Sequence, residues 1–230
     1  ISVEELEKID SSKITIVDVR PADQYSRGSF PGAVNIPLDE FEERMESVDR
    51  EKMSGWRKAG VTRLSFGVQS ANDRELGFLG RLHDFSQAKS AVETAAQVGF
   101  RHISCDIMLG VKGQTLESLW DSIESLTALP VDHISAYMLK IEPDTPFAKK
   151  ELILPDEDGY ANIYLETVER LSDKGFRQYE ISNFAKPGME SRHNLRYWRC
   201  EEYLGIGPAA HSYYLSLIHI SEPTRPLYIS

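Results

Sequence analysis

Apolar runs and amphipathic segments alternate along the middle of this chain. The runs RLSFGVQ (63–69), HISCDIML (102–109) and HISAYMLKI (133–141) are rich in apolar and β-branched residues, so each predicts a strand. Between and after them, apolar residues recur every three or four positions, which is typical of helices that pack on one side. Strands that alternate with helices predict βα units, and therefore a parallel sheet with right-handed crossovers.

Three helices are predicted from this spacing and from the signals at their ends. The first covers 86–99 and ends at Gly99, and Thr115 is placed to N-cap the second. Pro155-Asp156 opens the third helix, which Gly175 closes. The residues predicted to face the core from these helices are Ala88, Ala91, Val92, Ala95, Leu116, Leu119, Trp120, Ile123, Leu126, Tyr160, Ile163, Tyr164, Val168 and Leu171.

Composition and charge exclude several classes of protein. The 230 residues are 41% hydrophobic and 27% charged, as in an ordinary soluble globular protein. A net charge of −10 disfavours a nucleic-acid partner, and no apolar run approaches the roughly 20 residues of a membrane span. The start at Ile1, without an initiator Met, indicates a fragment. Two cysteines with no spacing pattern favour a reducing compartment, here the cytoplasm.

The first segment, 1–46, has a character of its own. It contains the parallel-type strand ITIVDVR, turns at Arg27-Gly28 and Pro31-Gly32, and a charged helical stretch, DEFEERM. The string VDVRPADQYSRGSFPGAVNIP resembles the first half of a rhodanese domain. That family carries its persulfide cysteine in a later loop, which this segment does not contain, and Ser29 stands where the family often has His. The resemblance implies an incomplete rhodanese-like fragment; the alternative is a generic α/β piece.

The long middle segment, about 47–214, carries an ordered series of motifs. They are GVTRLSFGVQS, GRLHD, CDIMLGVKGQT, ISAYMLKIEPDTPF, YEISNFAKPG, SRHNLRYW and YLGIGPAAHSYY. This series resembles the oxygen-independent coproporphyrinogen oxidase-like branch of the radical S-adenosylmethionine (SAM) enzymes, and within it the heme chaperone subgroup. The resemblance implies the later half of a partial (βα) barrel, SAM and heme as ligands, and heme-acceptor proteins as partners.

Three polar residues fall at or beyond strand ends, where (βα) barrels bind ligands. Gln69 ends its strand, Arg81 follows in the next segment, and Asp106 lies within HISCDIM. A guanidinium suits a methionyl carboxylate, while a carboxylate accepts hydrogen bonds from ribose hydroxyls. The resemblance implies that these three residues contact SAM. From the residues alone, Arg81 could instead pair with Asp84 or Glu75, and Asp106 could cap a strand end.

The turn LGVKGQT connects the second predicted strand to the second helix. Gly110, Gly113, Gln114 and Thr115 stand where the resembled family usually has L-P-G-Q-T, and Lys112 departs from that pattern. Glycine permits a sharp turn or a close approach of backbone to ligand. An ordinary loop before a helix explains the same residues without a ligand.

A second group of candidate residues lies in the motif HNLRYW. Imidazole is a common axial ligand of heme iron, and aromatic side chains offer flat apolar walls for a porphyrin. The resemblance therefore implies heme contacts from His193, Tyr197 and Trp198. The competing interpretation is a packed, hydrogen-bonded histidine beside aromatic residues.

The resembled family holds a [4Fe–4S] cluster with a CxxxCxxC triplet, whereas this chain has only Cys105, in an apolar strand, and Cys200. We therefore expect an inert core thiol at Cys105, no metal ligands and no catalytic residue in the chain as given. The tail 215–230, with LSLIHISEPTR, looks like a translated sequencing adapter, and we assign it no function. Two alternatives to an inactive fragment of the heme-chaperone type stay open: a rhodanese-like sulfurtransferase or sulfur carrier, and a nonfunctional chimeric reading frame.

Overall fold

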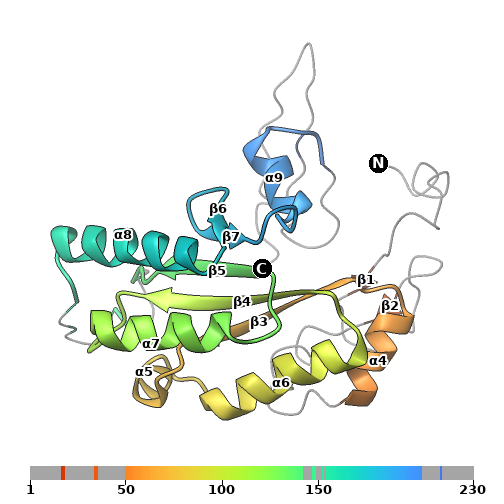
Figure 1. Cartoon of the computed structure of the whole chain (residues 1–230), viewed down its shortest axis with the longest axis horizontal. Helices are drawn as coiled ribbons and strands as arrows, with labels where there is room; N and C mark the ends of the chain where they lie inside the picture. Colours follow the sequence, from red (N-terminus) through yellow and green to blue (C-terminus); the bar gives the residue numbers. More distant parts are fainter. Residues whose placement is uncertain are drawn as a thin grey trace, which may run out of the picture. The chain divides into compact units, whose positions relative to one another are not determined.

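Three parallel strands, β3, β4 and β5, form one side of a five-stranded sheet in the computed structural model (Figure 1). The sheet order is β3-β4-β5-β7-β6, and β3–β4 and β4–β5 pair in parallel as predicted. The last two strands pair antiparallel, which the sequence pattern did not predict. The bounds are β3 Arg63–Gln69, β4 His102–Leu109, β5 His133–Met138, β6 Arg177–Gln178 and β7 Asn183–Ala185.

The structure describes residues 50–141, 147–148, 152, 154–203 and 213 with their side chains, and the backbone of 17–18 and 34–35. The chain forms two compact units, one made of residues 11–189 and the other of residues 1–10 with 190–230. The five-stranded sheet and most of the helices belong to the first unit. Within the described residues, no helix is both long and apolar enough to span a membrane.

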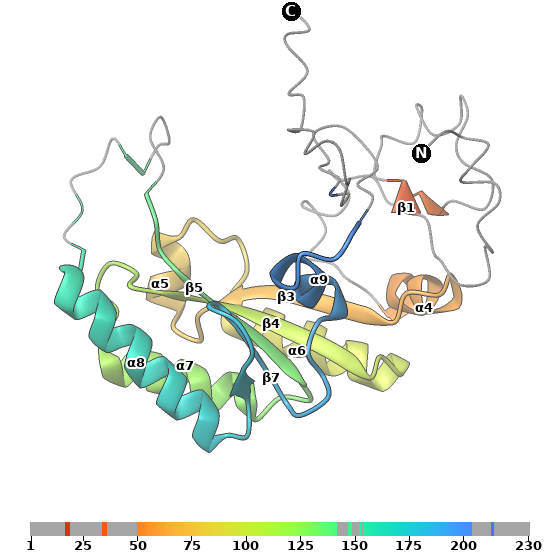
Figure 2. The same ribbon diagram turned by 90° about the horizontal axis from the view of Figure 1, so that it is seen from above.

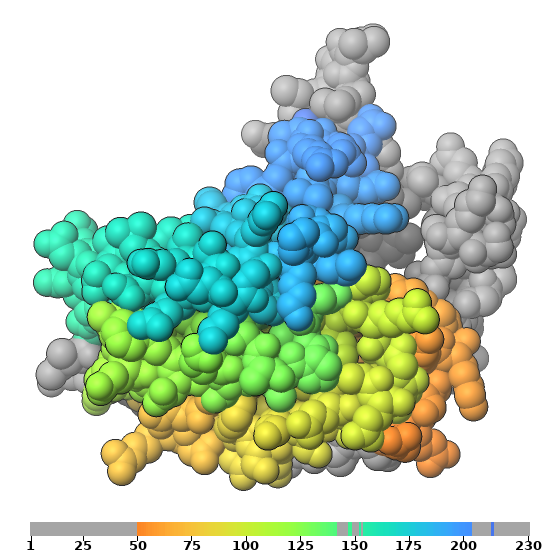
Figure 3. Space-filling view, in the orientation of Figure 1, coloured from red at the N-terminus to blue at the C-terminus, as the bar shows by residue number. Residues whose placement is uncertain are grey.

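Helices follow each central strand and cover one face of the sheet. Figures 1 and 2 show α6 after β3 and α7 after β4, with α8 running beside α7. In the space-filling view, α8, α7 and α6 form adjoining bands on one surface of the unit (Figure 3). The bounds are α4 Arg50–Lys58, α5 Asp73–Phe78, α6 Phe85–Val98, α7 Leu116–Thr127, α8 Glu157–Asp173 and α9 Arg192–Trp198.

The ends of the predicted helices are fixed by side-chain caps. The Asp84 carboxylate accepts the Gln87 amide and begins α6, which ends at Gly99 with a left-handed φ of 101°. Thr115 caps α7 as predicted, and Ser118 completes a reciprocal pair of bonds with it. Local chemistry therefore determines where these helices start and stop.

The core lies between the sheet and these helices. Alternate residues of the parallel strands point to it, and so do most of the predicted inward positions of the helices, with Leu119, Ile123 and Leu126 fully buried. The predicted positions Leu116, Tyr160 and Tyr164 are only partly buried and lie outside the core cluster. Trp120 is only partly buried and lies under the Arg170 guanidinium, 4.1 Å from the ring centroid. The parallel-strand residues in the core are Phe66, Val68, Ile103, Cys105, Ile107, Leu109, Ile134 and Ala136, and the short β7 adds the adjacent Phe184 and Ala185.

Two short segments before residue 50 are described. β1 (Val17–Asp18) pairs in parallel with β2 (Val34–Asn35), so ITIVDVR contributes to a parallel strand pair. The rest of the rhodanese-like segment and the whole tail 215–230 lie outside the described residues. The third predicted strand was too long, because β5 ends at Met138 rather than at residue 141.

Candidate functional site

The face of the sheet opposite the helices is polar. Strand alternation places on it the residues between the core positions, and we call this surface the polar face. Burying such residues in an apolar core would cost free energy, so the alternation separates a packing face from a face that can bind ligands. The side chains of the polar face are Arg63, Ser65, Gln69, His102, Ser104, Asp106, His133, Ser135 and Asn183.

Gln69 is held in an unusual conformation at the end of β3. The strand has a register shift between Phe66 and Gln69, and Gln69 has a left-handed φ of 70°. Its side chain folds back over Gly67, since a Cβ on Gly67 would lie only 2.8 Å from Gln69 Nε2. Gln69 is 7% exposed, yet its Oε1 has no hydrogen-bond partner in the described structure. A buried amide oxygen without a partner is a feature typical of a ligand site.

Asp106 lies in the middle of β4, on the polar face. Burial raises the pKa of its carboxyl group, because a charge in a poorly solvated environment is disfavoured. Hydrogen bonds from Ser135 and Ser65 oppose this shift, the latter at 3.1 Å from Oδ1. The carboxylate is therefore partly desolvated but supplied with two hydroxyl donors.

Arg81 lies in the loop between α5 and α6 and is exposed. Its positive charge lowers the pKa of Asp106, so the structure brings these two predicted residues within electrostatic reach. No hydrogen bond joins Gln69 Oε1 to either of them among the described residues. The alternative pairing of Arg81 with Glu75 is wrong, because Glu75 is buried and bonded to other residues.

The turn after β4 packs against a helix. Gly110 has a φ of 71°, and a Cβ there would overlap the ring of Tyr160 on α8. Its backbone N–H donates to Gln114 Oε1 at 2.8 Å. This glycine is thus required both by its conformation and by the close approach of Tyr160.

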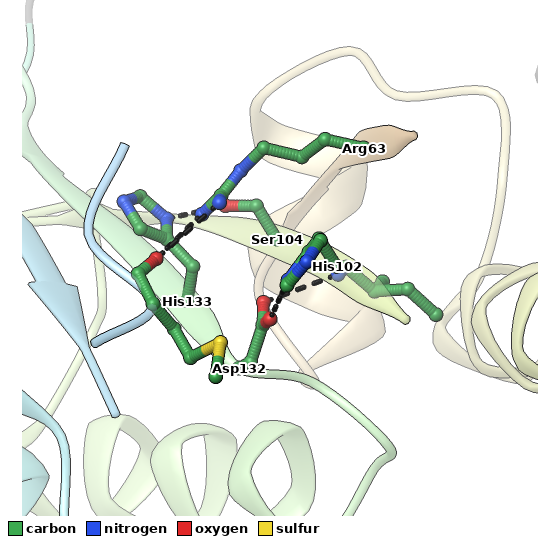
Figure 4. Close-up of polar contacts among 7 residues, drawn as sticks. Arg63, His102, Ser104, Asp132 and His133 are labelled. Carbon is green, nitrogen blue, oxygen red and sulfur yellow. Dashed lines mark hydrogen bonds and ion pairs between the residues drawn. The ribbon is translucent and has the colours of Figure 1, made fainter. Parts of the chain in front are cut away.

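A second polar cluster lies at the opposite, N-terminal end of the same strands (Figure 4). His133 is buried, and its ring nitrogens bond to Ser104 Oγ and to Tyr179 Oη, each at 2.7 Å. Burial lowers the pKa of His133 to about 4, and the charge of Arg63 acts in the same direction. His133 is consequently neutral near pH 7 and links β4, β5 and the segment before β7.

The neighbouring pair His102 and Asp132 is built differently. His102 Nδ1 and Asp132 Oδ2 are 2.7 Å apart, and the other carboxylate oxygen accepts the Ile103 amide at 3.1 Å (Figure 4). Arg63 donates to the Met189 carbonyl at 3.3 Å from both of its terminal nitrogens. Every polar atom named in this cluster has a partner, which is typical of a cluster that stabilises the sheet rather than of an open ligand site.

The predicted heme residues lie on α9, in the second compact unit. His193 Nε2 and Tyr197 Oη are 2.9 Å apart, and their rings meet edge to face with centroids 4.8 Å apart. Tyr203 extends the aromatic contact, 4.6 Å from the Tyr197 ring, and Trp198 is 55% exposed. We call His193, Tyr197 and Trp198 the α9 cluster.

The two cysteines differ in their burial. Cys105 is fully buried in β4, and burial, aided by the charge of Asp106, raises the pKa of its thiol. Cys200 is exposed, and no group of three potential metal ligands occurs among the described residues. The prediction that Cys105 is an inert core thiol agrees with this burial.

Several residues of the polar face were not predicted. Ser65, Ser135 and His133 were not proposed, although the three strands show a clear signal. In each, polar or small residues alternate with apolar ones over most of the strand, with Met108 as an exception, which is the period of a strand with one largely non-apolar face. That period, applied to all three strands together, identifies the whole face from the sequence alone.

Comparison with known proteins agrees with this geometry. Residues 34–126 match the family model of the radical SAM superfamily, and residues 2–60 match that of rhodanese-like domains. The sheet is similar to that of coproporphyrinogen III oxidase (HemN) from Escherichia coli, a radical SAM enzyme, with a TM-score of 0.62 and 22% identity over 74% of this chain and 42% of that one. The chain therefore contains a radical SAM domain with the partial-barrel fold.

More specific relatives are heme chaperones. The chain is 43% identical over 182 residues to the heme chaperone HemW of Bacillus subtilis, which covers 76% of this chain and 48% of the relative. It is 40% identical over 185 residues to a mouse protein named radical S-adenosyl methionine domain-containing protein 1, mitochondrial, covering 77% and 42%. The chain is thus a homologue of the HemW heme chaperones, and it spans about half the length of these relatives.

Proposed function

We propose that this chain is part of a heme chaperone of the radical SAM superfamily, with a SAM site on the polar face and a heme site on α9. The observation that carries the SAM site is the unpartnered, buried Oε1 of Gln69 beside a face that also holds Asp106. Gln69 offers an unsatisfied acceptor, Asp106 a carboxylate and Arg81 an exposed cation. This donor and acceptor set fits the ligand.

Each of the three residues has a separate task in this proposal. Arg81, which is exposed in its loop, binds the methionyl carboxylate through its planar fork of N–H groups. Asp106 accepts hydrogen bonds from the ribose hydroxyls, while Ser65 and Ser135 keep its carboxylate oriented. Gln69 Oε1 accepts a hydrogen bond from the ligand and so satisfies its own buried oxygen. SAM itself supplies, in this superfamily, an adenosyl group for radical chemistry.

For heme, the α9 cluster supplies one iron ligand and apolar surface. His193 brings an imidazole, and the exposed rings of Tyr197 and Trp198 can lie against a porphyrin. Heme is here the cargo, which the chaperone would pass to an acceptor protein. We place this function in the cytoplasm, although the mouse relative is named as mitochondrial.

A [4Fe–4S] cluster does not fit the residues present. Three closely spaced thiolates are needed, whereas the 230 residues contain two cysteines, one of them fully buried. We propose that the chain as given performs no radical chemistry and that only ligand binding remains. The same reasoning applies to sulfur transfer: the segment 2–60 matches rhodanese-like domains but contains no cysteine to carry a persulfide.

Isothermal titration with SAM tests the first site. The parent chain should bind SAM, and Gln69→Ala and Asp106→Asn should each weaken binding about tenfold, as expected for the loss of a buried hydrogen bond. Gln97→Ala is the matched control, since Gln97 is an exposed amide on α6. Equal affinity in all four proteins, or no binding by the parent chain, contradicts the SAM site.

Heme titration tests the second site. Adding heme should produce a Soret band in the parent chain that His193→Ala shifts or abolishes. His102→Ala removes a half-exposed histidine of the other unit and should leave the band unchanged. A band that is unaffected by His193→Ala would show that another residue binds the iron.

A further inference from the structure

Glu75 is a buried carboxylate that the proposed function does not use. It lies on α5, is 3% exposed, and forms no ion pair with any Lys, Arg or His among the described residues. Burying an unpaired charge is costly unless hydrogen bonds replace the lost water. Its surroundings must therefore compensate, and they do so with neutral donors only.

Three side chains donate to Glu75. Ser70 Oγ and Gln114 Nε2 donate to Oε2 at 2.8 Å and 3.0 Å, and Ser118 Oγ donates to Oε1 at 2.6 Å. Ser70 follows Gln69 directly at the end of β3, while Gln114 and Ser118 come from the turn after β4 and the first turn of α7. One carboxylate thus joins the two loops that leave the carboxyl ends of neighbouring strands.

All three donors bond backbone as well, and two of them shape the loops on either side of Glu75. Gln114 accepts the Gly110 amide at 2.8 Å and donates to the Met108 carbonyl at 3.1 Å, so it shapes the turn after β4. Ser70 Oγ accepts the Asn72 amide at 2.9 Å, which shapes the loop after Gln69. The Glu75 carboxylate therefore holds two side chains that themselves bond the backbone of both loops.

We propose that Glu75 is a positioning residue that holds the loop following Gln69 and the turn 110–115 in one arrangement at the edge of the polar face. The effect of Glu75 on ligand binding rests on the proposed SAM site, whereas its effect on the two loops does not depend on that site. Gln69 has a left-handed backbone and a side chain folded over Gly67, so its orientation depends on how the next residue, Ser70, is anchored. Glu75 acts on the ligand through Gln69 and does not touch it.

The first arm of the test needs no ligand. Hydrogen–deuterium exchange is measured on the full chain and on Glu75→Gln, with the exposed Glu117→Gln as the matched control. Glu75→Gln has nearly the same shape but loses an acceptor, so protection of the amides of Asn72 and Gly110 should fall at least about tenfold. Protection within α6 should not change, and Glu117→Gln should behave like the parent chain. Unchanged protection at Asn72 and Gly110 overturns the inference.

The second arm measures SAM affinity in a double-mutant cycle of Glu75→Gln and Gln69→Ala. If Glu75 acts through Gln69, each single variant weakens binding about tenfold and the double variant is no weaker than Gln69→Ala. Additive losses would overturn the positioning role, because a general loss of stability acts independently of Gln69. Failure of the parent chain to bind SAM contradicts the proposed function instead, and the exchange measurement then decides the role of Glu75 alone.

Discussion

The polar face and the α9 cluster are two ways of building a binding site. Gln69, Asp106 and Ser135 are far apart in sequence and lie on one face because parallel strands place them there, while Arg81 acts on Asp106 from a loop. His193 and Tyr197, by contrast, are four residues apart on one helix and contact each other through helical geometry alone. The first site depends on the whole sheet, whereas the second depends on two turns of helix.

This difference has consequences for energy and for accessibility. The polar face keeps a buried amide oxygen and a desolvated carboxylate in place, and both cost stability until a ligand binds. The α9 cluster is exposed, so its unliganded state costs little. Changes that damage the sheet should therefore abolish SAM binding while leaving the α9 cluster able to contact heme.

The largest expected effect comes from Gly110→Ala. A Cβ would collide with the Tyr160 ring on a backbone of φ 71°, so the free energy of unfolding should fall by about 3–4 kcal/mol. Urea unfolding measures the loss, and Gly113→Ala is the control, because Gly113 has a similar φ of 80° but open space around it. SAM binding should decline with the fold, while the heme Soret band persists; parallel loss of both would show that the sites are not independent.

Acid should weaken the sheet through His133. Its folded pKa of about 4 lies below the ordinary value of 6.5, so the neutral form is favoured in the fold. The stability it contributes is complete above pH 6.5 and is lost as the pH falls toward 4, amounting to about 3 kcal/mol. Urea unfolding of the parent chain from about pH 7 to about pH 4.5 should show this loss.

His133→Gln should remove most of that pH dependence, whereas His102→Gln should keep it, because His102 is half-exposed. An unchanged slope in His133→Gln would assign the acid sensitivity to another group.

Asp106→Asn should separate stability from binding. Because burial raises the pKa of Asp106, the ionised form is penalised in the fold at neutral pH, while below pH 3.8 the residue is protonated in both states. The variant should therefore be more stable than the parent near pH 7, with the gain disappearing in acid. Thermal unfolding measured near pH 7 and below pH 3.8 checks this. A variant that is less stable than the parent near pH 7 would show that the hydrogen bonds from Ser65 and Ser135 outweigh the cost of desolvating the carboxylate.

The smallest effect on stability is expected on α9. Tyr197→Phe removes one exposed hydrogen bond, worth about 0.5 kcal/mol or less, and frees His193 Nε2. Heme affinity should rise about fivefold, because the iron no longer competes with the Tyr197 hydroxyl for that nitrogen. A Soret titration measures it, with Tyr203→Phe as the matched control. Weaker binding in Tyr197→Phe would mean that the hydroxyl itself supports the heme.

Much of the fold followed from local patterns. β3 and β4 have the predicted bounds, and Asp84, Thr115 and Gly99 cap their helices by the chemistry of their own side chains or backbone. The antiparallel pairing of β7 with β5 could not be predicted. The sequence of β7, NFA, is only three residues long and becomes a strand through that pairing. Tertiary contacts override so weak a local signal.

The site was predictable in its members but not in its geometry. Resemblance and strand position indicated Gln69 and Asp106, yet the register shift that turns Gln69 over Gly67 depends on pairing between β3 and β4. The burial of Glu75 was not predicted, because a carboxylate in a short helix normally faces solvent. Its burial becomes intelligible only once Ser70, Gln114 and Ser118 converge on it.

The sheet order also has a consequence for self-association. In the described part of the chain, β3 and β6 are the two edges of the five-stranded sheet, and they differ in length: seven residues against two. A seven-residue edge offers enough unpaired amides and carbonyls to recruit a foreign strand, whereas a two-residue edge does not. Of these two described edges, β3 is therefore the one at which strand addition should occur.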